Sequence, residues 1–95
     1  MRVEWDEPKR QSNREDHGVD FKDAALIFAG IFLEAEDTRR DYGETRVRAL
    51  GHVGDDYFMI VFTWRGEARR IISAWRVDDE GKRRYEAIPN RNPPG

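Results

Sequence analysis

Apolar side chains are concentrated in two runs of the chain, Tyr57–Trp64 and Ile71–Val77. Both runs use residue types that favour strands, and the polar link Arg65–Arg70 between them contains Gly66, which is typical of a hairpin. The first run is apolar on both of its alternating faces. The pattern therefore predicts a strand in the middle of a sheet, with other elements packed above and below it.

The N-terminal part of the chain predicts a short strand and two helices. Met1–Trp5 alternates apolar and polar residues, as a short edge strand does. The entirely polar stretch Lys9–His17 is expected to be helical up to Gly18, although a helix that is polar all round has little to bury. Asp20 is expected to cap a second helix, which carries a core-facing apolar stripe and ends at Gly30.

Two further strands and a helix complete the predicted elements. The strands are Ile31–Glu36 and Thr45–Val53, separated by a charged loop. Asp78 and Asp79 can cap a final helix that extends to about Ala87. The fold class that follows is α+β, with an N-terminal helical pair, an antiparallel sheet around the central hairpin and a C-terminal helix. We expect one domain over residues 1–88 and a disordered tail over residues 89–95.

The chain is highly charged but nearly neutral, with 38% charged residues and a net charge of −2. A protein that binds nucleic acid through charge alone is usually basic, so this class is excluded unless the arginines gather on one face. The lack of cysteine excludes disulfides and thiolate metal sites, and two histidines are too few to predict a metal site. No apolar run is long enough to cross a bilayer and no signal peptide is evident, so a cytoplasmic protein is expected.

Arginines accumulate on the central hairpin and on the helix that follows it: Arg65, Arg69, Arg70, Arg76, Arg83 and Arg84. Guanidinium groups bind phosphate through paired donors, and rings such as those of Trp75 and Tyr85 can stack on bases. If the last helix folds onto the sheet, these side chains form one basic and aromatic patch. The alternative is that the arginines pair with nearby acids or keep a strand edge soluble.

A second candidate site is the stripe Lys9, Asn13 and His17, whose members are spaced four apart and therefore share one helix face. Its functional interpretation is a cation, an amide and a titratable imidazole directed at one substrate or partner. The alternative is a solvated face with a histidine near a helix C-terminus. His52 has no evident companion and is expected to be a surface strand residue. Gly-rich phosphate loops and nucleophilic triads are absent, which excludes a conventional hydrolase by motif.

An ordered set of segments resembles the BrnT family of small toxins from bacterial toxin–antitoxin pairs. The segments run in order from Val3 to Glu86 and include EWDEPK, HGVDF, YGETRVRALGHVG, IVFTWRGEARRIISAWR and RRYE. The resemblance implies a RelE-like fold, a ribonuclease activity that arrests translation, and neutralisation by a small antitoxin. In such pairs the antitoxin typically carries a ribbon-helix-helix domain, and the hetero-oligomeric complex binds operator DNA to repress its own promoter.

The resemblance also implies a catalytic set of His17, Arg70, Arg76 and Tyr85. The RNA 2′-hydroxyl attacks the scissile phosphate in RelE-like ribonucleases, so no metal or other cofactor is implied. Arg70 and Arg76 are expected on the same face of one strand by alternation, where they would hold the phosphate. His17 is the candidate acid or base, and Tyr85 is expected to stack on a base or to transfer a proton. The implied RNA-binding residues are Lys9, Asn13, Arg65, Arg84 and Trp75.

Three residues depart from the family pattern. Trp75 stands where the family usually has an arginine, Asp16 where a lysine is common, and Gly81 where a helix former is typical. The first two remove positive charge. The main prediction is an RNA-cleaving toxin. The alternative is a catalytically weak or inactive homologue that acts as a protein-binding subunit of a toxin–antitoxin repressor complex, and a third interpretation is a small antiparallel domain whose arginines are structural.

Overall fold

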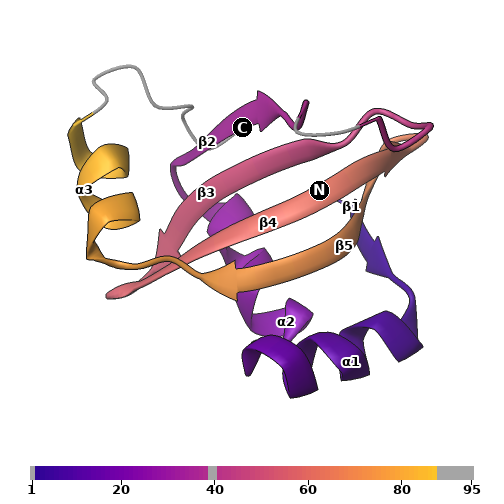
Figure 1. The fold of residues 1–95 in the computed structure, drawn as a ribbon, viewed down its shortest axis with the longest axis horizontal. Helices are drawn as coiled ribbons and strands as arrows, with labels where there is room; N and C mark the ends of the chain where they lie inside the picture. Colours follow the sequence, from indigo (N-terminus) through magenta and orange to yellow (C-terminus); the bar gives the residue numbers. More distant parts are fainter. Residues whose placement is uncertain (1, 39–40, 88–95) are drawn as a thin grey trace.

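A curved five-stranded sheet forms the centre of the molecule (Figure 1). The computed structural model describes residues 2–38 and 41–87, with side chains as far as Arg83. In spatial order the strands are β1 (Arg2–Trp5), β5 (Ala68–Arg76), β4 (Asp56–Arg65), β3 (Val47–Val53) and β2 (Phe32–Glu36). The α+β class is confirmed, and β4 occupies the central position that its two apolar faces predicted.

Four of the strands form an antiparallel meander, from β2 through β3 and β4 to β5. The short strand β1 pairs in parallel with the first half of β5, so that Glu4 lies beside Arg70. An edge strand was predicted at this end of the chain, but its parallel partner was not. Because β1 stops at Trp5, the second half of β5 has no strand on its outer side among the described residues.

The helical segments that follow β1 pack against the edge of β5 and against one face of the sheet. Helix α1 (Glu7–His17) ends at Gly18, whose φ of 67° allows its N–H to bond to Arg14 O as a C-terminal cap. The predicted second helix is divided into α2 (Phe21–Ala24) and the 3₁₀ helix η1 (Ala25–Ala29). Tighter winding suits this stretch because a 3₁₀ segment aligns residues three apart, and Ala24 and Ile27 are both fully buried.

The core lies between these helices and the face of the sheet that carries Phe58, Ile60 and Phe62. Phe28 packs edge-on against Phe62, with ring centroids 5.7 Å apart. Gly51 on β3 allows close approach of η1, because a Cβ at this position would lie 2.9 Å from the Cβ of Ile27. We call this side of the sheet the helix-covered face.

A β-bulge in β5 changes which side chains share a face. Val61 pairs with Ser73 and Phe62 with Ile71, so the extra residue in β5 shifts the alternation of the strand. As a result Arg70 lies opposite Thr63 whereas Arg76 lies opposite Phe58, and these two β4 residues point to opposite sides. The expectation that Arg70 and Arg76 share one face is wrong. The hairpin is also tighter than predicted, since only Gly66 and Glu67 separate the two strands.

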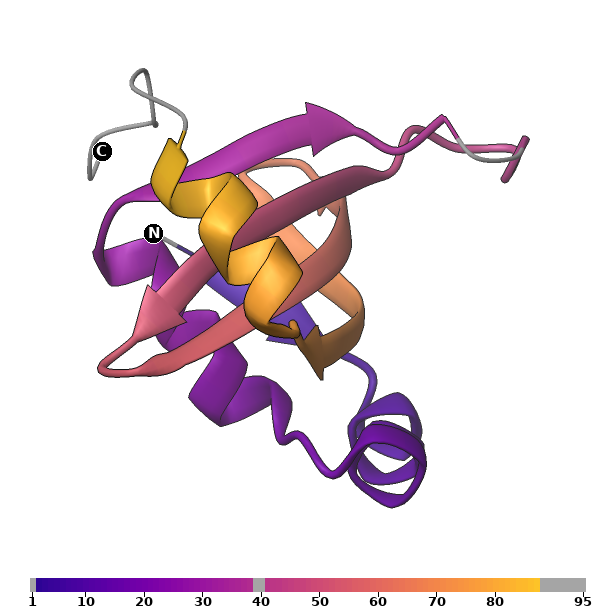
Figure 2. The same ribbon diagram turned by 60° about the vertical axis from the view of Figure 1, so that its left-hand side comes forward.

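Helix α3 (Asp79–Ala87) lies on the other side of the sheet, which we call the open face (Figure 2). Asp78 caps it as predicted, accepting a hydrogen bond from the Gly81 N–H at 2.9 Å. Lys82 places its Nζ 5.2 Å from the centre of the Tyr57 ring on the open face. No helix in the described part of the chain is long and apolar enough to cross a membrane. The predicted tail lies outside the described residues.

Candidate functional site

The position of α1 is set by a buried amide. Asn13 is 5% exposed, and its Nδ2 donates to Ala74 O at 2.8 Å and to Val19 O at 2.9 Å. Its Oδ1 accepts a hydrogen bond from the Ala74 N–H at 3.1 Å. The Asn13 amide therefore fills the hydrogen-bonding positions of an adjacent strand, on the edge of β5 that β1 leaves uncovered. All these contacts are internal, so the implied role of Asn13 in binding RNA does not fit its environment.

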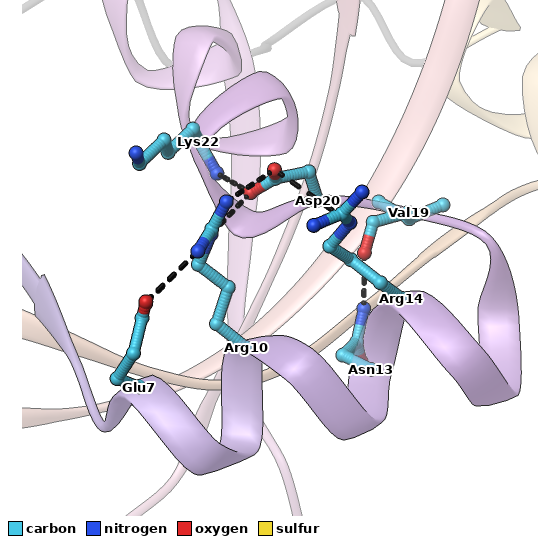
Figure 3. A network of polar contacts seen from close by, with 7 residues as sticks. All are labelled: Glu7, Arg10, Asn13, Arg14, Val19, Asp20 and Lys22. Carbon is cyan, nitrogen blue, oxygen red and sulfur yellow. Dashed lines mark hydrogen bonds and ion pairs between the residues drawn. The ribbon is translucent and has the colours of Figure 1, made fainter.

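A second contact ties α1 to the start of α2 (Figure 3). The Arg10 guanidinium donates to both oxygens of Asp20, each at 2.9 Å, and also to Glu7 at 2.8 Å. The hydrogen bonds from Arg10, reinforced by the one from the Lys22 N–H, lower the pKa of Asp20 to about 2. Burial opposes this shift but does not cancel it. The turn between the helices is thus held by a charge-assisted network.

With α1 held in this way, its last residue comes close to the end of β5. The ring centroids of His17 and Trp75 lie 6.2 Å apart with their planes tilted by 40°. An open groove runs between them, lined by Asp16, His17, Trp75 and Arg76. Three of the predicted site residues, His17, Trp75 and Arg76, are therefore brought together. We call this feature the α1–β5 groove.

Arg76 supplies the cation of the α1–β5 groove. Its side chain is 62% exposed, its Nη1 donates to Asp56 Oδ1 at 3.0 Å, and its Cζ lies 5.7 Å from the Phe58 ring centre. An exposed ion pair of this kind contributes little to stability, about 0–1 kcal/mol. The guanidinium can therefore leave Asp56 for a phosphate at small cost. Arg76 also borders a second hollow, which lies between α2 and the β3–β4 turn.

The other arginines of the hairpin lie at the opposite end of the sheet. Arg70 donates to Glu4 at 2.6 Å and so links β5 to β1. Arg65 forms an ion pair with Glu44 at 3.6 Å. Six residues separate Arg70 from Arg76, which is about 20 Å along a strand. The two arginines therefore cannot hold one phosphate, and the predicted single basic patch does not form in the described part of the molecule.

Arg69 is a special case because it is buried, with its side chain only 10% exposed. Its guanidinium donates to Glu34 Oε1 at 2.8 Å. Around it lie four aromatic rings whose centres are 4.6–5.5 Å from Arg69 Cζ, those of Phe28, Phe32, Phe62 and Trp64. This arginine is part of the core, as the structural alternative in the sequence analysis anticipated.

The remaining predicted site residues are dispersed or outside the described side chains. Lys9 is exposed in the first half of α1, about 12 Å along the helix axis from His17. Arg84 and Tyr85 belong to α3, and their side chains lie outside the described part of the structure. The described residues contain no group of three or more His, Asp or Glu side chains suited to holding a metal ion.

The sequence analysis missed the neighbour of His52. The His52 ring lies 5.1 Å from the Tyr57 ring, centroid to centroid, with planes tilted by 30°. The two residues pair directly across β3 and β4 on the open face. The turn has two residues, Gly54 and Asp55, and counting outward from it gives this pairing, so the hairpin register was the signal that could have found it.

Residues 5–81 match the family model described as "Ribonuclease toxin, BrnT, of type II toxin-antitoxin system". The chain belongs to this family. The matched segment contains the whole α1–β5 groove and ends before Arg84 and Tyr85. Because the family consists of toxins of type II toxin–antitoxin systems, an antitoxin is implied as the partner. The resemblance seen in the sequence is confirmed.

A solved structure supports the same assignment. The crystal structure of the Brucella abortus ribonuclease toxin, BrnT, at 1.1 Å resolution is similar, with 30% sequence identity and a TM-score of 0.64. The match covers 83% of this chain and 99% of that one. No functionally curated protein matches the sequence. The structural similarity thus extends over most of the chain.

Proposed function

We propose that this BrnT-family chain cleaves single-stranded RNA in the α1–β5 groove and thereby inhibits translation in the cytoplasm. The observation that carries the proposal is the convergence of His17, Trp75 and Arg76, which come from two distant segments of the chain. An imidazole, a guanidinium and a flat ring are the groups needed to move a proton, to stabilise a phosphorane and to hold a base.

The proposed reaction is internal transfer at phosphorus. The 2′-hydroxyl loses its proton to neutral His17 while its oxygen attacks the adjacent phosphate. The O2′–P bond forms, the P–O5′ bond breaks, and the imidazolium returns the proton to the departing O5′. The Arg76 guanidinium stabilises the charge on the non-bridging oxygens. The products are a 2′,3′-cyclic phosphate and a 5′-hydroxyl, and no step requires a metal ion.

The other predicted contacts are assigned around this centre. Trp75 would stack on a base beside the scissile phosphate. Lys9 lies along the outer part of α1, and Arg84 and Tyr85 lie on α3, so these residues would extend the contact with RNA. Because Arg70 is engaged with Glu4 and points to the other face from Arg76, we assign the phosphate to Arg76 alone. Arg65 and Arg70 would touch only a longer RNA that continues along the sheet.

The proposed partner is a small antitoxin with a ribbon-helix-helix domain, which binds operator DNA when in complex with the toxin. We also propose that the five-stranded sheet and its helices are a variant of the RelE-like fold. The family assignment supports the antitoxin, and the antiparallel meander with N-terminal helices supports the fold.

The decisive experiment is cleavage of an end-labelled single-stranded RNA by the full chain in the presence of EDTA. His17→Ala is expected to lower kcat by a factor of about 10²–10⁴ and Arg76→Ala by about 10²–10³, because each removes a group acting on the reacting phosphate. Arg2→Ala is the matched control. Arg2 is exposed on β1 beside Ala68, at the end of β5 away from the α1–β5 groove. This variant should cleave as the parent does.

Two outcomes would contradict the proposal. If both groove variants cleave at the parent's rate, the active centre lies elsewhere on the molecule. If an RNA with a single 2′-deoxyribose at the cleavage position is still cut there, the nucleophile is not the 2′-hydroxyl. Thermal melting of each variant checks that any loss of cleavage is not a loss of folding.

A further inference from the structure

The last turn of α1 presents opposite charges on the two sides of His17. Successive residues of an α-helix are turned by about 100° around its axis, so Asp16 lies about 100° to one side of His17 and Arg14 about 60° to the other. Both of these side chains are exposed, and His17 lines the α1–β5 groove. An RNA strand that reaches His17 is therefore repelled on the Asp16 side and attracted on the Arg14 side.

The neighbouring end of β5 shows the same division. Trp75 lies on the open face and Arg76 on the helix-covered face, because consecutive strand residues point to opposite sides. Arg14 approaches Asp20 at the start of α2, and Asp20 lines the second hollow, which Arg76 also borders. Both cations are thus on the α2 side of the α1–β5 groove, whereas the ring of Trp75 is on the open-face side.

The N–H donors of Arg14 are available because Arg10 already occupies the nearby carboxylate (Figure 3). Arg10 donates to both oxygens of Asp20 at 2.9 Å, and the Lys22 N–H donates to one of them at the same distance. Arg14 Nε remains 4.0 Å from Asp20 Oδ2, which is too far for a hydrogen bond. Among the described residues the Arg14 guanidinium donates no hydrogen bond, and its side chain is 52% exposed.

An exposed guanidinium with unused donors is suited to a phosphate, which it binds through two parallel N–H groups. The Arg14 side chain leans toward Asp20 and away from the end of α1 that carries His17. It is therefore placed for a phosphate beside the scissile one rather than for the scissile phosphate itself. The alternative is that Arg14 only complements the C-terminal end of the helix dipole, which contributes about 0.3–1 kcal/mol to stability.

We propose that Arg14 binds the RNA phosphate next to the scissile one and so directs the backbone along the α2 side of the α1–β5 groove. This phosphate subsite rests on the proposed cleavage at His17 and deepens it. The backbone contacts come from Arg14 and Arg76, and the bases project toward Trp75 on the open face. The acidic side of the last turn of α1, at Asp16, stays clear of the phosphates.

The first test is binding of a short fluorescein-labelled, 2′-O-methylated single-stranded RNA, followed by fluorescence anisotropy over a range of salt concentrations. One phosphate contact with a single strand contributes about −0.7 to the slope of log K against log salt, so Arg14→Ala should make the slope shallower by this amount. Binding at low salt should weaken by about 3- to 30-fold, as expected for one charged contact. Arg14→Lys should keep the slope. The matched control is Arg2→Ala, which removes the same charge at the far end of the sheet and should bind as the parent does.

A scan of the RNA locates the contact. Each phosphate in turn is replaced by an uncharged methylphosphonate. At one position beside the scissile bond this change should weaken binding to the parent about as much as Arg14→Ala does, and it should have no effect on binding to Arg14→Ala, because both changes remove the same contact. If every methylphosphonate affects the parent and Arg14→Ala equally, the subsite is overturned.

Cleavage of unmodified RNA separates this proposal from the preceding one. We expect Arg14→Ala to raise KM and to leave kcat nearly unchanged, because Arg14 does not touch the reacting phosphate. If the parent cleaves RNA and Arg14→Ala keeps the parent's affinity and salt slope, Arg14 serves only the helix end, and the active centre is unaffected. A parent that binds through Arg14 but does not cleave overturns the proposed function alone. A loss of kcat as large as that in His17→Ala would contradict the assignment of Arg14 to the neighbouring phosphate.

Discussion

Asn13 bonds to both backbone groups of Ala74, donating to its carbonyl at 2.8 Å and accepting from its N–H at 3.1 Å. The amide of a helix residue thus acts as the missing strand at the edge of β5. His17 lies one turn further along the same side of α1, which brings its ring to Trp75. The geometry of the α1–β5 groove therefore depends on a residue that need not touch RNA.

Replacement of Asn13 by alanine should destabilise the protein strongly. The change leaves the Ala74 N–H and C=O and the Val19 C=O without their side-chain partner in a buried place. We expect the free energy of unfolding in urea to fall by about 2–4 kcal/mol. Gln11→Ala is the control, because Gln11 is exposed on the same helix. Equal stability of the two variants would show that the Asn13 amide is dispensable.

The Arg10–Asp20 contact should make stability depend on pH in the acid range. The folded pKa of Asp20 is about 2 against an ordinary value of 3.8, so the unfolded chain binds a proton first as the pH falls. The stabilisation is complete above pH 4 and is lost between pH 4 and pH 2. Arg10→Gln should therefore be less stable than the parent at pH 7, and the difference should shrink on going to pH 2. Urea unfolding curves at several pH values measure it, and a constant difference would rule out this linkage.

Much of the fold could be predicted because its signals are local. Gly18 ends α1 and Asp78 caps α3 through backbone geometry that the residue types themselves favour. The two-sided apolar run identified β4 as the central strand. Charge pairing of the far arginines was also among the alternatives that the sequence left open.

The features that define the site depend on pairing across the fold. The bulge beside Ile72 is visible only in the register of β4 and β5, and it places Arg70 and Arg76 on opposite faces. The burial of Asn13 follows from the uncovered edge of β5, which exists because β1 pairs in parallel and stops early. The sequence of the polar helix α1 does not reveal that Asn13 is buried, because the helix-face pattern identifies only buried apolar residues.

Because η1 packs closely on β3 at Gly51, even a methyl side chain at this position should destabilise the protein. A Cβ there would lie 2.9 Å from Ile27 Cβ and 3.2 Å from Phe32 Cβ, and both neighbours are fixed in the core. Gly51→Ala should lower the free energy of unfolding by about 1–3 kcal/mol through overpacking. Gly30→Ala is the matched control, because its nearest contact would be an ordinary 3.9 Å. A neutral Gly51→Ala in thermal and urea unfolding would show that η1 can move away from the sheet.

The ion pair of buried Arg69 with the partly exposed Glu34 predicts coupling between two strands that are not neighbours. The pair joins β5 to β2 at 2.8 Å, and Arg69 cannot find water inside its four aromatic rings. Glu34→Gln leaves that cation without a counter-charge, so a loss of about 2–3 kcal/mol is expected. In an Arg69→Met background the same change should cost little, because methionine fills the aromatic site without a charge. A double-mutant cycle measured by urea unfolding should therefore give a coupling energy of about 1–3 kcal/mol between Arg69 and Glu34. If the effects of the two changes are additive, the aromatic rings alone hold Arg69 in place.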